Sequence, residues 1–179
     1  MQDFVDQAFK NGVQLSDKGN CDFCGADFPR GIFDCVNYCN TIIENLDLKN
    51  PKHLIFRFLI VDSHALQHPE IHGTWSNHFH LTRMHLILEK KKNWTHKTSP
   101  LLSHYLNNYK TLKPHEYLHP PAPLKRGQIN TNDFAIVKTA AACMPLIKRW
   151  AEEVYMAWKD HHCKIAPIAE GFLKRADHR

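Results

Sequence analysis

The sequence predicts an all-α fold, a helical bundle of five or six helices with a small cysteine-containing knuckle near the N-terminus. Asn50-Pro51 and Ser99-Pro100 each place an N-cap residue before a proline that suits the first helical position. No stretch alternates apolar and polar residues as a half-buried strand would. Apolar residues recur at helical spacing, as in the group His80, Leu81, Met84, Ile87 and Leu88.

The segment after Pro51 is apolar nearly all round, so its pattern alone also fits a buried strand. Its length and its Asn-Pro start favour a central buried helix, which Pro69 ends. In the last helix, Trp158 shares a face with Ile147, Ala151 and Val154, so we expect its ring to be buried. The helices are expected at 33–48, 51–68, 74–92, 100–109, 131–142 and 145–164, with an irregular, polyproline-like connection at 113–128.

The length of 179 residues fits a single domain. We expect an N-terminal arm and knuckle at 1–33, the helical bundle at 34–165 and a tail at 166–179. No apolar run approaches the roughly 18 residues of a membrane span, and the first ten residues lack the basic and apolar regions of a signal peptide. These observations predict a cytoplasmic protein that does not associate with membranes.

The formal net charge is +5, yet the chain has one basic run, at residues 90–92. This run lies at the expected end of a helix, where cations offset the helix dipole. Aromatic residues do not interleave with further bases there, which disfavours a nucleic-acid partner.

Six cysteines fit a reducing compartment if they are thiols or metal ligands. Cys21-x-x-Cys24-Gly25 has the spacing with which two thiolates bind one zinc ion. A redox motif would need a helix directly after the pair, and Gly25 and Pro29 disfavour that helix. Plain thiols in a turn are the third interpretation.

One cysteine pair is half of a zinc site, and the sequence offers two ways to complete it. Cys35 and Cys39 lie one helical turn apart, although both also fit as small apolar core residues. Alternatively, separate helices direct histidines inward: His68, His80, and His161 or His162. Asp62 is a candidate to orient a ligand imidazole through a hydrogen bond, or to form a buried salt bridge.

Several short motifs occur together in a fixed order, and their combination resembles the bacterial domain-of-unknown-function 5946 family. They are C-x-x-C-G at 21–25, a cysteine at 35, V-D-x-x-A-x-Q-H-P at 61–69, H-L at 80–81, P-P-A-P at 120–123 and A-W-x-x-H-H at 157–162. The family has no assigned activity, so the resemblance implies no reaction. The motif positions are Cys21, Cys24, Cys35, Asp62, Gln67, His68, His80, His161 and His162.

The chain departs from the family pattern in three places. Phe23 replaces a more usual proline, and His64 stands where an aromatic residue is common. The stretch between Gly25 and Cys35 is short and lacks a histidine that is often found there. Cys39 lies outside the pattern, which weighs against a site of four cysteines.

We therefore predict a zinc site of Cys21, Cys24, His68 and His80. The next candidate ligands are Cys35 and His162, and Asp62 and His161 are candidates to support the ligands. The leading hypothesis is a structural zinc. The alternatives are a hydrolase-like metal-dependent enzyme that uses Asp62, His68 and His80, and a metal-free interaction module.

Overall fold

The computed structural model describes residues 2–112, 116–137 and 139–177, and these residues contain helices and no named strand. The predicted all-α class is confirmed, with seven α-helices in the described residues instead of five or six. The helices are α1 Gln2–Lys10, α2 Ile32–Glu44, α3 Pro51–Gln67, α4 Thr74–Leu88, α5 Thr98–Leu112, α6 Ala140–Ala157 and α7 His162–Asp177. Short 3-10 turns are η1 Pro69–Ile71, η2 Thr131–Phe134 and η3 Lys159–His161.

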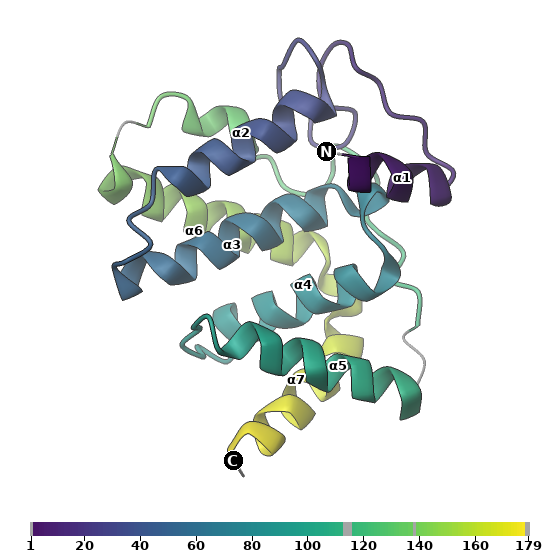
Figure 1. Cartoon of the computed structure of the whole chain (residues 1–179), viewed down its shortest axis with the longest axis vertical. Coiled ribbons are helices and arrows are strands. Elements are labelled where there is room, and N and C mark those ends of the chain that lie inside the picture. The colour runs from purple at the N-terminus through teal and green to yellow at the C-terminus, as the bar shows by residue number, and fades with distance from the viewer. Residues whose placement is uncertain (1, 113–115, 138, 178–179) are drawn as a thin grey trace.

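Helix α3 lies at the centre of the bundle, as its apolar sequence predicts. It packs against α2, α4 and α6, and α4 in turn packs against α5 and α7 (Figure 1). The side chain of Asn50 accepts a hydrogen bond from the backbone N–H of Lys52, and Pro51 occupies the first turn. The Asn-Pro start is therefore a true helix cap.

Two predicted boundaries in the C-terminal half are wrong. Thr131 begins only a 3-10 turn, and the side chains of Asn130 and Asp133 form a capping box at its start. Helix α6 begins later, at Ala140, where the Thr139 side chain caps the backbone of Ala142. Pro145 lies inside α6 instead of starting it; lacking an N–H, it cannot donate the helical hydrogen bond to the carbonyl four residues before it.

The chain turns at Trp158, so the long helix expected at 145–164 is two helices. Trp158 is fully buried together with Ile147, Ala151 and Val154, which confirms the predicted apolar face. The segment expected as a tail is helical as far as Asp177, because α7 buries Phe172 and other apolar side chains against the bundle. Residues 178–179 of that tail, and 113–115 of the irregular connection, lie outside the described residues.

The N-terminal arm also differs from its expectation, because residues 2–10 form helix α1. Phe4 and Ala8 of this helix pack with the knuckle cysteines in a small apolar cluster separate from the main core. The other members are Phe23, Ala26, Ile32 and Ile71, with Val13, Leu15, Phe28, Phe33 and Val36 at its edge. Of the helices described, none has the length and hydropathy that crossing a bilayer requires.

Polar contacts fix the C-terminal end of α3. The Gln67 side chain donates to the Ile129 carbonyl at 2.8 Å and accepts from the Trp150 indole N–H at 2.9 Å. The buried guanidinium of Arg126 donates to the Gln67 carbonyl at 2.9 Å and to both carboxylate oxygens of Glu70. Helix α6 and the segment 126–129 are thereby attached to the point where α3 ends.

We expect Trp158→Ala to lower the free energy of unfolding by about 3–5 kcal/mol, as other buried aromatic truncations do. The substitution leaves a large cavity and removes the hydrogen bond from the indole N–H to the Leu66 carbonyl. Urea unfolding followed by circular dichroism measures the change. Met156→Ala is the control, since this side chain on α6 is exposed and should cost about 0.5 kcal/mol or less. A loss below about 1 kcal/mol for Trp158→Ala would contradict the prediction.

Candidate metal centre

The knuckle is a tight turn that brings two cysteines to one side. The Cys21 N–H donates to the Ala26 carbonyl at 2.9 Å, and the Gly25 N–H donates to the Cys21 carbonyl at 2.8 Å. Gly25 has a φ of 77°, in the left-handed region that favours glycine. A β-carbon there would also lie 3.3 Å from the Leu124 side chain. The glycine after the second cysteine therefore serves the turn itself.

Two helix ends supply the other donor groups. Cys35 lies in the first turn of α2, and His68 is the C-cap residue of α3. The His68 Nδ1 lies 2.6 Å from the His64 carbonyl, which can only accept, so Nδ1 carries the proton. In the neutral ring the lone pair of His68 is then on Nε2, which faces the cysteine sulfurs.

The four side chains converge on one point. His68 Nε2 lies 3.4 Å from the Cys21 sulfur and 3.6 Å from the Cys35 sulfur. The sulfurs of Cys24 and Cys35 are 3.7 Å apart, and all four donor atoms lie within 4.8 Å of one another. The six cysteines are free thiols, and the four residues of this Cys3His cluster are buried. Its members are Cys21, Cys24, Cys35 and His68, and they are positioned to hold a metal ion.

The close packing of the four side chains shifts the pKa values of three of them, Cys21, Cys35 and His68. Hydrogen bonds from Cys24 and Cys35, with His68 close by, lower the pKa of the Cys21 thiol. Hydrogen bonds to Cys21 and Cys24, and burial, raise the pKa of Cys35. Burial alone would lower the pKa of His68, but hydrogen bonding to the Cys21 and Cys24 sulfurs raises it to about 10. The Cys21 thiol therefore ionises more easily than the Cys35 thiol, because its neighbours donate hydrogen bonds to it.

Three further side chains surround the cluster. The Thr131 hydroxyl lies 3.4 Å from the Cys35 sulfur, and the His64 Nε2 lies 3.7 Å from it. The His64 ring stacks on His68 with centroids 4.1 Å apart, and Phe23 meets His68 edge-on. The sequence argument missed His64 and Thr131 as neighbours of the site. His64 lies one helical turn before His68, and this spacing could have predicted that the two imidazoles share a face of the helix. Thr131 is distant in the sequence and reaches the cluster only through the tertiary fold.

Of the predicted ligand set, Cys21, Cys24 and His68 lie in the cluster and His80 does not. Cys35, named as a next candidate, takes the fourth place. Cys39 belongs to the main core, as its interpretation as a small apolar residue requires. The expected completion by an additional histidine is therefore corrected to completion by Cys35.

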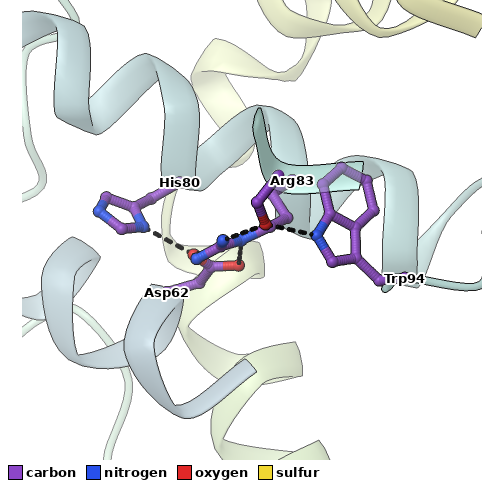
Figure 2. Close-up of polar contacts among 5 residues, drawn as sticks. Asp62, His80, Arg83 and Trp94 are labelled. Atoms are coloured by element: carbon purple, nitrogen blue, oxygen red, sulfur yellow. Dashed lines mark hydrogen bonds and ion pairs between the residues drawn. The ribbon is translucent and has the colours of Figure 1, made fainter. Parts of the chain in front are cut away.

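His80 is absent from the cluster because Asp62 holds it elsewhere (Figure 2). The His80 Nδ1 lies 2.6 Å from the fully buried Asp62 carboxylate. Arg83 also donates to this carboxylate, through Nε at 2.9 Å and through its terminal nitrogen, and reaches the Ser99 hydroxyl. The Trp94 indole N–H donates to the same hydroxyl. Asp62 thus orients an imidazole as expected, although not that of a residue in the cluster, and it forms the buried salt bridge as well.

The two histidines after Trp158 lie away from the cluster. His161 Nε2 is 2.7 Å from the His119 carbonyl. The ring of His162 stacks on Tyr155 at 3.9 Å, and its Nε2 lies 3.0 Å from the Tyr155 carbonyl. The turn at Trp158 ends the helical face that was expected to direct these residues inward. The candidate ligand His162 and the candidate supporting residue His161 therefore both lie outside the Cys3His cluster.

Comparison with known proteins identifies a family, but the function of that family is unknown. No curated protein and no solved structure matches the chain. The sequence pattern of the family of unknown function DUF5946 matches residues 19–159, which include all four members of the Cys3His cluster. The chain therefore belongs to the DUF5946 family, as its motifs led us to expect.

Proposed function

We propose that this protein binds one zinc ion through Cys21, Cys24, Cys35 and His68, and that the metal has a structural role. The distances within the cluster carry the proposal. In a tetrahedral site with Zn–S bonds of about 2.3 Å and Zn–N bonds of about 2.0–2.1 Å, two sulfurs lie about 3.8 Å apart and a sulfur and a nitrogen about 3.6 Å apart. The measured separations are 3.7 Å for the sulfur pair and 3.4 and 3.6 Å for the sulfur–nitrogen pairs.

The donor set supports zinc over the hard divalent cations. Thiolates and imidazole suit zinc, whereas magnesium and calcium prefer oxygen donors. The His64 carbonyl orients His68, and Thr131 offers a hydroxyl to the Cys35 sulfur. Contacts of this kind hold ligands in place in zinc sites.

The closed arrangement favours a structural role over a hydrolytic one. A catalytic zinc keeps a coordination position for water, whereas four protein groups fill a structural site. The enzyme hypothesis placed Asp62, His68 and His80 around an open position. His68 instead faces the sulfurs, and His80 is bound to Asp62. The metal-free alternative has less support, because it gives no reason for three thiol sulfurs and the His68 Nε2 to lie within 4.8 Å of one another.

Metal binding would connect three parts of the chain that are far apart in the sequence. The knuckle supplies Cys21 and Cys24, α2 supplies Cys35, and the end of α3 supplies His68. Because binding orders all three segments, its free energy contributes to folding. The proposed function is thus to stabilise the N-terminal third of the protein.

The first test compares two cysteines on the same helix. We expect Cys35→Ala to abolish stoichiometric zinc, because it removes one of four ligands. Cys39→Ala should retain one zinc per chain, since Cys39 is a buried core residue one turn further along α2. Metal content after zinc supplementation and desalting is measured by atomic emission. Equal zinc content in the two variants would contradict the assignment of Cys35.

The second test separates a structural from a catalytic metal. If the zinc is structural, Cys21→Ser and His68→Ala should both lower metal content and melting temperature, and a chelator should lower the melting temperature of the unmodified protein. Cys163→Ser is the control, because this thiol is exposed and outside the cluster. A metal that Cys21→Ser retains and His68→Ala loses would instead indicate a catalytic site based on histidines.

A further inference from the structure

Two imidazoles outside the Cys3His cluster lie beside each other near the end of α3. His72 follows η1 and lies four residues after His68, and His80 belongs to α4. Their ring centroids are 5.8 Å apart. Neither residue belongs to the proposed zinc site, and the structural role of that zinc does not require them.

His80 is oriented in the way that metal-binding histidines usually are. Asp62 forms an ion pair with Arg83, so its carboxylate acts as an acceptor and His80 must donate from Nδ1. The His80 Nε2 then carries the lone pair. It makes no hydrogen bond to any residue that the structure describes, and the side chain keeps 11% of its surface exposed. Carboxylate–imidazole pairs of this type fix the tautomer and ring orientation of metal ligands.

His72 supplies a second available nitrogen. Within the described parts of the chain, no hydrogen bond engages its ring nitrogens. His72 is half-buried and lines a cavity of about 340 Å³ next to Thr74 and Asn77. The cavity gives an ion access to the ring and leaves room for solvent ligands.

We propose that His72 and His80 bind a second ion, a divalent transition metal of the zinc, nickel and copper class. One imidazole nitrogen from each residue would hold it beside the cavity that His72 lines, and water or a small ligand would complete its coordination. Among the described residues, the Cys3His cluster is the one group in which three or more possible metal-ligand atoms lie within 4.8 Å of one another, and His72 and His80 are not part of it. The second site is therefore an open site with two protein ligands. It should bind its metal more weakly than the four-ligand zinc centre does, and its metal would keep positions for water or a small ligand.

The test uses Ni²⁺ as the probe, titrated by calorimetry into full-length protein already saturated with zinc. Unmodified protein should bind one further equivalent without losing zinc. His72→Gln and His80→Gln should each weaken that binding at least about tenfold. Asp62→Asn should weaken it about 10- to 100-fold, as loss of an orienting carboxylate does in metal sites. His104→Gln is the matched control, because this histidine on α5 is exposed and should leave binding unchanged.

The variants also separate this proposal from its alternatives. If Asp62→Asn unfolds because Arg83 loses its partner, His72→Gln decides the matter, since the His72 side chain is half-buried and makes no hydrogen bond to a described residue. Nickel binding that His72→Gln leaves unchanged, or no binding beyond the zinc, would overturn the proposal. Retention of the nickel site in Cys35→Ala would show that it is independent of the zinc centre. A protein that binds nickel but no zinc would refute the proposed function and leave this inference standing.

Discussion

The C-terminal end of α3 carries the polar contacts on which the rest of the structure depends. Gln67 accepts from Trp150 of α6 and donates to the Ile129 carbonyl, which fixes helix α6 and a connecting segment to one amide. The next residue, His68, ends the helix and turns its imidazole toward the cysteines. A shift of this helix end would therefore move both the bundle contacts and the metal centre. The two parts of the fold are positioned by adjacent residues.

The buried charges near α3 provide specificity more than net stability. Asp62 is fully buried, and its ion pair with Arg83 must offset the cost of removing both groups from water. Arg83 also stacks against the rings of Phe58 and Phe79, so an apolar side chain of similar size could fill the space. Replacing the whole Asp62–Arg83 pair with apolar side chains would, however, leave His80 without its acceptor. The Asp62 carboxylate is thus better explained by its role in orienting the His80 imidazole than by the packing of α3 on α4.

Local signals in the sequence predicted the all-α class and three of the four residues of the Cys3His cluster. Cys21-x-x-Cys24-Gly25 is a short motif whose geometry follows from the turn itself, so it could be recognised without a tertiary structure. His68 was also predicted, since the helix and the proline after it determine where it lies. The choice between Cys35 and His80 as the fourth ligand could not be made from the sequence. It depends on the hydrogen bond between Asp62 and His80, which joins α3 to α4 and keeps His80 outside the cluster. The break at Trp158 was missed because the apolar spacing continues through it to His161 and His162.

The division of the protein into two apolar clusters explains why a metal would belong at their junction. The main core contains large buried side chains from α3 to α7, including Trp94, Trp150 and Trp158. The knuckle cluster is much smaller and includes three of the thiols themselves. An apolar cluster of that size buries too little surface to order a loop and a short helix unaided. Coordination by Cys35 of α2 and His68 at the end of α3 would attach this cluster to the large core, because both helices also contribute side chains to that core while Cys21 and Cys24 belong to the knuckle.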